Sequence, residues 1–358
     1  MAYSIRVMER DDVASVCRML DQVFGDRNPI YRNWQEVIEW LYFSPAIKDR
    51  IPRAFVIADE HSVVGHIGLT LSEFTDGTQS LSVVQTANWV VDPNFKVGLL
   101  SLRLIHEATS LGEVAIVIGG TELNQRIIPR LGFKKHLDVE RYIKVLKPAS
   151  YLSMSRSGKG LLRNGGKLMM FMAESPLSLL NISGKRQHAE HRLTESSGYD
   201  SVGVPGPSAS AISTLPRRVL RNAMSADFLN WYKQYPQGDV HILKLCGEGT
   251  RPIGLATVLL RSRKGSRFAN LLNVDTDTDD PLVWSDIVCA TERFLRDKGV
   301  IHINALATFE PLRQALKMNG YCKLNCLPLW IRDKDNRLGS VEAWHITAIE
   351  GDLGYLFE

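Results

Sequence analysis

Hydrophobic and polar residues in the first 145 positions recur with two periods, one of about 3.6 residues and one of two. Val13, Val16 and Leu20 follow the helical period directly behind Asp11 and Asp12, which can cap that helix. Other short runs are rich in β-branched residues and end at turn signals, as strands do. The pattern predicts strands at 4–7, 54–58, 63–74, 81–91, 114–118 and 135–145, and helices that begin near 13, 34, 99 and 122.

The second half of the chain repeats landmarks of the first half in the same order. The matched pairs are Trp40 and Trp231, Gly65 and Gly254, and Gly132 and Gly320. Each tryptophan precedes a proline by five residues, and each of the last two glycines precedes an aromatic residue. The separations are 191, 189 and 188 residues. A repeat this regular predicts two copies of one domain fold.

Length and composition agree with two soluble domains. A chain of 358 residues can hold two cores of about 150 residues and a connector. The formal charge of +4 is too small to argue for a nucleic-acid partner. No apolar run approaches the roughly 20 residues that span a bilayer, and the N-terminus has no apolar signal core. These features predict a cytoplasmic protein.

Five cysteines show no disulfide framework. Cys322 and Cys326 are four residues apart in a strand-like segment, and no second pair accompanies them. We expect apolar cysteines there and no metal ligand.

The predicted order of elements in the first half is strand, helices, three strands, helix, strand, helix and strand. Together with the stretch from Asn124 to Gly132-Phe133, it resembles the GNAT family of acyl-CoA-dependent N-acyltransferases. The resemblance covers about residues 4–145 and, more weakly, 217–350, and it is closest to bacterial tandem-GNAT proteins. It implies an α/β fold in which each copy is a mixed, mostly antiparallel sheet flanked by helices.

The same resemblance divides the chain into three parts. Residues 1–146 form an N-terminal GNAT-like domain with the acyl-CoA site, 147–216 a connector, and 217–358 a degenerate second GNAT-like domain. Within the connector, residues 146–174 are basic and partly apolar, and Ser, Gly and Pro dominate 196–214. The favoured interpretation of the basic segment is a helical element packed across both domains. The alternative is contact with a membrane surface or a lipid-linked substrate.

In the GNAT family, acetyl-CoA or another acyl-CoA places its pyrophosphate at the start of the helix after the fourth strand. The family motif there is Arg/Gln-x-x-Gly-x-Gly/Ala. Pro93 sets the register and puts Lys96 in the cation slot, while Gly98 stands one position early. The loop is therefore degenerate, and a plain strand-to-helix turn is the alternative. The resemblance assigns cofactor binding to Val90, Val91, Lys96, Val97, Gly98, Leu99 and Asn124.

The resemblance also raises the question of which groups move the proton. Many family members have a tyrosine acid in the slot that Ile128 fills here, so that acid is absent. The main requirement is then a base for the attacking amine. Glu73, His66 and Glu122 are the candidates.

The fourth predicted strand, 83–91, carries no carboxylate, although the family often has one there. Its polar residues are Gln85, Thr86 and Asn88. They could bind substrate or orient a water, but they cannot act as strong bases. We therefore expect them to contribute to substrate binding.

The second copy differs most at the place where a pyrophosphate would bind. The segment 275–280 carries four aspartates, at 275, 277, 279 and 280, which would repel that anion. Helix capping and a solvated loop are favoured there over a calcium site, because the later glycine and glutamate of a calcium loop are missing. We expect the second copy to be structural or to bind substrate.

Three functions remain open from the sequence. The first is acyl-CoA-dependent N-acyltransfer to a primary amine of a small molecule or sugar. The second is a pseudoenzyme or binding module that keeps the fold. The third is acyl transfer from another carrier, such as acyl carrier protein or aminoacyl-tRNA. The identity of the amine and the oligomeric state are not predicted.

Overall fold

The computed structural model describes residues 3–24, 34–45, 53–95, 98–155, 192–195, 219–246, 252–263, 265–339, 341, 343–351 and 354. Most of the basic connector segment lies outside the described residues, as does the Ser/Gly/Pro-rich segment. No helix in the described ranges has the length and apolar character needed to cross a bilayer.

The first copy has the predicted order of elements. It consists of β1 (Ser4–Val7), α1 (Val13–Phe24), α2 (Trp34–Phe43), β2 (Ala54–Ala58), β3 (Val63–Thr75), β4 (Ser80–Val91), α3 (Leu99–Thr109), β5 (Val114–Ile118), α4 (Glu122–Ile127) and β6 (Lys134–Val145), followed by α5 (Pro148–Ser155). Every predicted strand is confirmed with bounds that differ by one residue at most.

The second copy follows the same plan. Its elements are β7 (Arg192–Glu195), β8 (Val219–Asn222), α8 (Ala226–Lys233), β9 (Asp239–Cys246), β10 (Pro252–Arg263), β11 (Ser266–Asp275), α9 (Pro281–Asp297), β12 (His302–Ala307), α10 (Glu310–Met318) and β13 (Cys322–Asp333), and β14 (Ala343–His345) follows. β7 pairs antiparallel with β9, as β1 does with β2. The fold class is confirmed, because both halves are mixed sheets flanked by helices.

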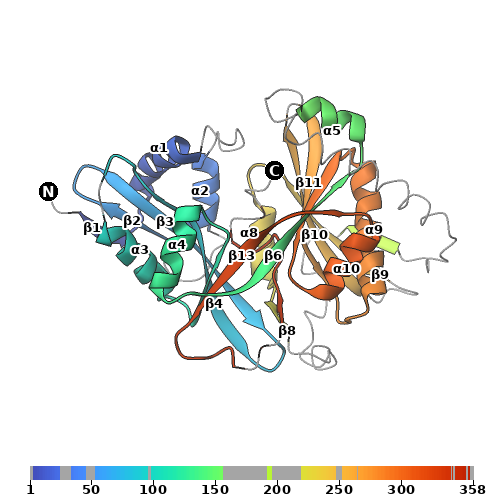
Figure 1. The fold of residues 1–358 in the computed structure, drawn as a ribbon. Coiled ribbons are helices and arrows are strands. Elements are labelled where there is room, and N and C mark those ends of the chain that lie inside the picture. Colours follow the sequence, from blue (N-terminus) through green and yellow to red (C-terminus); the bar gives the residue numbers. More distant parts are fainter. Residues whose placement is uncertain are drawn as a thin grey trace.

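The two copies exchange their last strands and so form one continuous sheet (Figure 1). Its order is β1-β2-β3-β4-β5-β13-β6-β12-β11-β10-β9-β7. β13 of the second copy pairs with β5 of the first, and β6 of the first copy pairs with β12 of the second. β6 and β13 also pair with each other at the centre. Neither half therefore completes its sheet from its own residues.

The two repeat tryptophans meet between the halves. The indole N–H of Trp40 donates to the carbonyl of Trp231 at 2.9 Å, and the indole N–H of Trp231 donates to the carbonyl of Trp40 at 3.0 Å. The rings stack with centroids 4.5 Å apart and an interplanar angle of 4°. A reciprocal contact between equivalent residues is what a two-fold axis produces. The internal repeat is thus an approximate two-fold symmetry.

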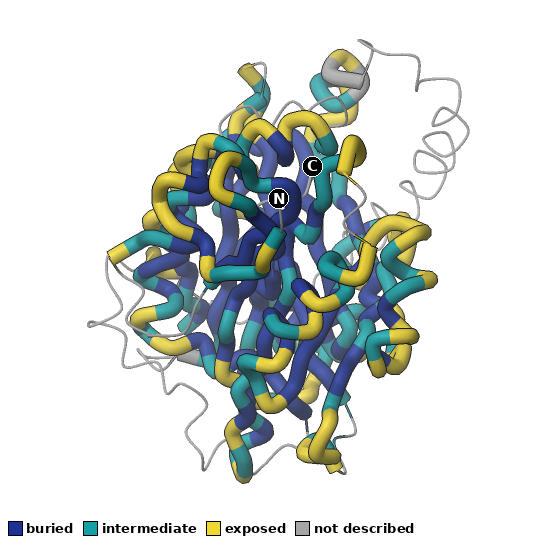
Figure 2. Tube along the Cα trace, turned by 90° about the vertical axis from the view of Figure 1, so that its left-hand side faces the viewer, coloured by how far each residue is buried: buried dark blue, intermediate teal, exposed yellow. Residues whose placement is uncertain are grey.

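Helices cover both faces of the sheet and define where the cores lie. α1, α2 and α8 pack on a core shared by the two halves, which contains both repeat tryptophans. α3 packs on the opposite face of the first half, and α9 and α10 cover the second half. Figure 2 shows the buried parts of the chain in the interior and the exposed parts around them.

A buried ionic cluster holds the exchanged strands together. Glu140 on β6 is 6% exposed and accepts hydrogen bonds from Arg313 of α10 at 2.8 and 3.0 Å and from Lys323 of β13 at 2.6 Å. Tyr142 also donates to it. Burial raises the pKa of Glu140, but these hydrogen bonds and the Arg313 charge outweigh burial and hold it below its usual value. The carboxylate therefore stays ionised between its cations.

Candidate active site

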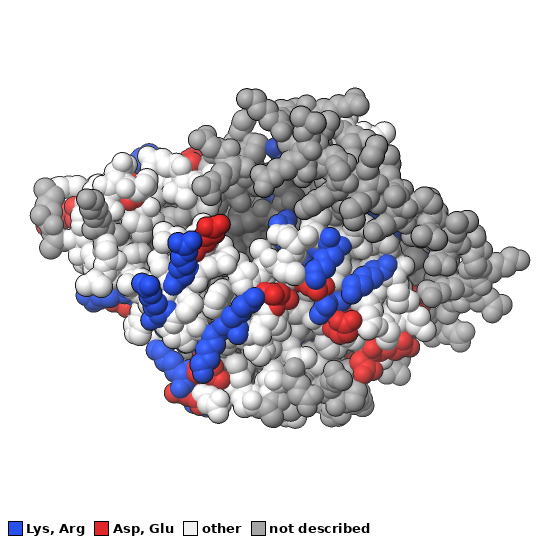
Figure 3. Space-filling model, in the orientation of Figure 1, with Lys and Arg blue, Asp and Glu red and all other residues white. Residues whose placement is uncertain are grey.

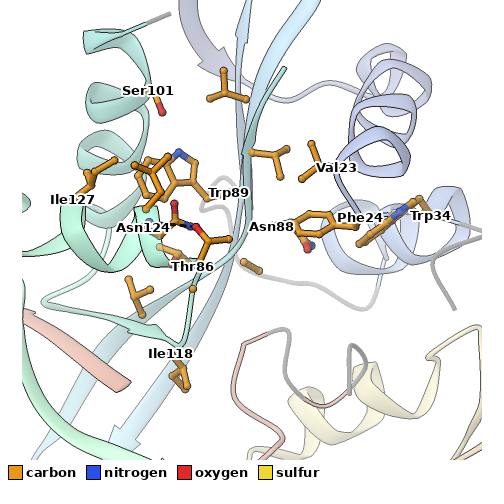
Figure 4. A pocket seen from close by; sticks show the side chains of 17 residues that line it. Val23, Phe24, Trp34, Thr86, Asn88, Trp89, Ser101, Ile118, Asn124 and Ile127 are labelled. Atoms are coloured by element: carbon orange, nitrogen blue, oxygen red, sulfur yellow. Dashed lines mark hydrogen bonds between the residues drawn. The ribbon is translucent and has the colours of Figure 1, made fainter. Parts of the chain in front are cut away.

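In the first half the sheet opens between β4 and β5. The two strands pair in parallel only at Val83–Gln85 with 114–116, and they part beyond that point. A cavity of about 450 Å³ lies in the opening (Figure 4). Backbone groups of β4 beyond Gln85 that face this opening are not paired with β5. They are free to bind a ligand.

The cavity reaches both faces of the sheet. On one face it is lined by Ser101 of α3 and by Leu123, Asn124 and Ile127 of α4. On the other face it is lined by residues from the end of α1 and the start of α2: Val23, Phe24 and Trp34. Figure 4 shows β4 running between these two groups. None of the 17 described residues that line the cavity carries a charged side chain.

A bulge in β4 shapes the middle of the cavity. Opposite β3, the register shifts between His66, which pairs with Val90, and Gly68, which pairs with Ala87. Asn88 lies in the bulge with φ = 52°. Asparagine tolerates this left-handed region better than most residues. The bulge therefore turns the end of β4 out of the regular pairing pattern at the point where the cavity opens.

A hydrogen bond from the side chain of His66 stabilises this bulge. The Nδ1 of His66 lies 3.1 Å from the carbonyl oxygen of Asn88. A carbonyl only accepts, so the ring carries its hydrogen on Nδ1. Burial lowers the pKa of His66 to about 4, and the hydrogen bond to Asn88 only partly offsets this. The ring is thus neutral near pH 7 and positions the bulge.

The structure brings five of the predicted binding residues together. Val90, Val91 and Asn124 line the cavity, as do Thr86 and Asn88. Gln85 is buried at the last paired position of β4, next to the opening. The cofactor and substrate roles of these residues stay predictions.

The predicted phosphate loop is described only in part, because Lys96 and Val97 lie outside the described residues. Gly98 is the N-cap of α3 and has φ = 42°, and no side chain caps that helix start. A Cβ at this glycine would meet no atom within 4 Å. Leu99 is 78% exposed at the first helical position. The helix start is therefore open to solvent.

The carboxylates proposed as bases lie outside the cavity. Glu73 is exposed and pairs with Ser82, six residues before Asn88 on β4. At about 3.3 Å per residue, this places it about 20 Å from the bulge. Glu122 is exposed in the first turn of α4 and lies 3.9 Å from Arg126. Of the three candidates, His66 alone contacts the bulge.

We therefore expect the substitution Glu73→Gln to leave kcat within about threefold of wild type, since a base must reach the amine directly or through one water. A loss of about a hundredfold would instead show that Glu73 comes to the reacting groups. Measurement of kcat for Glu122→Gln is the matched comparison, because the Glu122 carboxylate lies beside residues that line the cavity.

The corresponding opening in the second half is filled by the chain itself. β11 and β12 pair only at 269–271 with 303–305. The C-terminal segment then enters: the Ile349 N–H donates to the Leu272 carbonyl at 2.9 Å, and the Thr308 N–H donates to the Ile346 carbonyl at 3.2 Å. This segment therefore bridges the end of β11 and the loop after β12, where the first copy has its cavity.

Two of the four aspartates of the second copy have partners in local structure. Asp280 caps α9 by accepting from the Leu282 N–H at 2.9 Å, which confirms the predicted capping. Asp275, the last residue of β11, pairs with Arg221 at 2.6 Å. The Asp280 carboxylate thus occupies the helix start that corresponds to the open start of α3.

Sequence reasoning missed the apolar lining of the cavity and the C-terminal segment. Val23, Phe24 and Trp34 stand at the end of one amphipathic helix and the start of the next. Their spacing is that of ordinary core residues. No motif marks residues 344–354.

No family model matches the sequence, and a search of curated proteins gives no match either. Solved structures do match. A GCN5-related N-acetyltransferase from Anabaena variabilis is 9% identical, with a TM-score of 0.58 over 92% of this chain and 72% of that one. N-myristoyltransferase from Saccharomyces cerevisiae, with bound myristoyl-CoA, is 10% identical, with a TM-score of 0.59 over 92% and 82%. A probable N-acyltransferase from Enterococcus faecalis is 8% identical, with a TM-score of 0.57 over 95% and 75%.

These similarities extend over nearly the whole chain at low identity, so they define its fold. The protein has the GNAT fold. Its two halves have the same order of elements and exchange their last strands.

Proposed function

We propose that this protein is an acyl-CoA-dependent N-acyltransferase that transfers an acetyl or other acyl group directly to a primary amine of a small molecule. The single observation that carries the proposal is the opening beside the β4 bulge, which holds a cavity in the first copy and the chain's own C-terminal segment in the second. The N-myristoyltransferase to which the chain is similar in fold has myristoyl-CoA bound in its structure, which agrees with this choice.

The reaction joins the amine nitrogen to the thioester carbonyl carbon. A tetrahedral intermediate forms, and the C–S bond then breaks to release the CoA thiolate. Unpaired N–H groups of β4 beyond Gln85 would stabilise the oxyanion, since fixed donors in a partly dry site act more strongly than water does. The pantetheine arm would lie on the side of Ser101 and Asn124, with the pyrophosphate at the start of α3.

The proton of the amine would leave through water. The described cavity lining contains no acid or base side chain, and Ile128, in the slot of the family's tyrosine acid, is fully buried. The amine must therefore arrive neutral. The rate constant kcat/KM should rise with pH along one limb set by the pKa of the substrate amine.

Calorimetry with acetyl-CoA tests the cofactor site and should give one site per chain. The substitution Gly98→Asp should weaken binding at least about tenfold, because a carboxylate at the start of α3 repels the pyrophosphate. Gly98→Asn is the neutral control and should weaken binding less. Gly265→Asp is the control for backbone strain, since Gly265 also has a positive φ (76°) and open space around a Cβ.

Two results would contradict the assignment. One is an affinity for acetyl-CoA that Gly98→Asp leaves unchanged. The other is a site whose affinity responds instead to Asp280→Ala, at the start of α9. Absence of any acetyl-CoA binding would favour a binding module or a different acyl carrier.

A further inference from the structure

The side chain of Asn88 is buried in the cavity wall with unused hydrogen-bonding capacity. The residue is 5% exposed, and neither its Oδ1 nor its Nδ2 has a hydrogen-bond partner among the described residues. Most buried polar side-chain atoms in proteins are paired, so an unpaired amide in a cavity wall is a candidate to bind a ligand. The main chain of Asn88 is held by a hydrogen bond from His66 to its carbonyl oxygen.

The amide points to one particular side of the cavity. Figure 4 shows Asn88 on the side of Phe24 and Trp34, whereas Asn124 and Ser101 lie on the other side. In the proposed function the pantetheine arm occupies the side of Asn124. The acyl group and the acceptor then lie toward Asn88. An acyl chain has no hydrogen-bond donor, so the group that donates to Asn88 Oδ1 belongs to the acceptor.

The chemistry of a carboxamide narrows the acceptor further. It has one oxygen that accepts and one NH₂ group that donates. An ammonium group only donates and a carboxylate only accepts, so either would leave half of the Asn88 amide unpaired. A hydroxyl or a neutral amine has a single heavy atom, and a trans peptide amide turns its N–H and C=O in opposite directions, so neither forms two parallel hydrogen bonds with one carboxamide. A primary carboxamide has an N–H and a C=O on the same edge and forms both. The surrounding walls are apolar and, among the described lining residues, uncharged.

We infer that the acceptor carries a primary carboxamide beside its amine and an apolar substituent, as an amino-acid amide does. The amide pairs with both polar atoms of Asn88, and the apolar substituent packs on Phe24 and Trp34. This inference rests on the proposed function for the side on which the acceptor binds, but the Asn88 subsite can be measured without turnover.

The test is calorimetric titration of three matched probes into the protein saturated with CoA, which permits binding but no transfer. L-Phenylalaninamide has the amide, phenethylamine lacks it, and L-phenylalanine replaces it by a carboxylate. We expect the amide to bind at least about tenfold more tightly than either of the others, because an unpaired buried group penalises the analogue that lacks its partner.

Two variants separate the effect of the Asn88 side chain on binding from the effect of the backbone bulge. Glycine accepts the left-handed backbone of residue 88, so Asn88→Gly removes the amide and keeps the bulge. It should reduce the preference for phenylalaninamide to within about twofold. Asn88→Asp keeps the size and the acceptor but loses the donor, and it should bind the amide more weakly than wild type. CoA affinity should change less than twofold in both.

The outcomes distinguish this inference from the proposed function. Equal binding of the three probes, no binding of any probe, or a preference that survives Asn88→Gly overturns the Asn88 subsite while CoA binding stands. The same titrations without CoA test whether the Asn88 subsite exists in a protein that does not bind CoA. A preference for the amide in a protein that does not bind CoA would keep the subsite and overturn the acyl-CoA assignment.

Discussion

A chain that ends at Ala149 should fail to fold into a stable domain, although it contains every helix and strand of the first copy. β5 would lose β13, and β6 would lose both of its neighbours, β13 and β12. Trp40 would lose its reciprocal partner Trp231. Unpaired strands at the centre of a sheet leave backbone groups unsatisfied and expose apolar faces that aggregate.

The expected result is an insoluble or non-cooperative fragment, as seen by size-exclusion chromatography and near-UV circular dichroism. The matched control keeps all residues and breaks only the chain: fragments 1–173 and 174–358 are expressed together. The break lies between α5 and β7, so the exchanged strands can still pair. The two fragments should purify as one complex. A soluble, cooperative fragment 1–149 would show that β6 can pair with β5 directly.

The strand exchange explains why the sequence predicts the elements but not their partners. Strand runs predicted the bounds of each strand of the first copy within one residue, and helical spacing predicted where its helices begin, since these patterns arise from local burial. β6 and β13 occupy the same place in the repeat, so either could complete the sheet beside β5. The choice depends on long-range contacts, such as Glu140 with Arg313 and Lys323, that no local pattern encodes.

The candidate site was predictable where it follows the family framework and not elsewhere. Thr86 and Asn88 were expected to bind substrate because they are polar residues on a strand that is otherwise apolar, and both line the cavity. The bulge at Asn88 could not be foreseen, because it is a shift in pairing between two strands. Glu73 was proposed as a base from its charge and strand, while its distance from the bulge depends on the register of β3 and β4.

The free energy of unfolding should be largest between about pH 6.5 and 7 and should fall on both sides. Burial lowers the pKa of His66, His302 and His345 to about 4, below the ordinary 6.5 of histidine. The unfolded chain then binds more protons than the folded one between these values. Stability is present above pH 6.5 and is lost as the pH falls toward 4.

The titration of Glu350 changes stability with pH in the opposite direction. Burial raises its pKa to about 8 from 4.5, although Thr347 donates to the carboxylate through its N–H at 2.6 Å and its hydroxyl at 3.0 Å. The folded state holds this proton over that range, so stability falls as the pH rises from 4.5 through 8. With about 1.4 kcal/mol per pKa unit, the net loss should be roughly 4 kcal/mol at pH 4.5 and roughly 1 kcal/mol at pH 9.

Thermal unfolding from pH 4.5 to 9 measures this directly, and two variants divide the effect between its causes. Glu350→Gln keeps the hydrogen-bond acceptor and removes the titration, so the decline in Tm above pH 7 should flatten. His302 stacks on Phe268 with an interplanar angle of 3°, and His302→Phe should preserve that packing and reduce the net acid loss by about half. A wild-type Tm that stays constant from pH 5 to 9 would mean that these four groups keep their ordinary pKa values and are hydrated in the folded protein.

If His302→Phe loses as much stability in acid as wild type does, the acid loss comes from His66 and His345 alone. Both of those rings donate to backbone carbonyls of the strands that carry the two openings of the sheet, His66 to Asn88 of β4 and His345 to Val274 of β11. Protonation there would act first on the ends of β4 and β11, so acid should release bound acetyl-CoA from the β4 side at a pH above that of global unfolding.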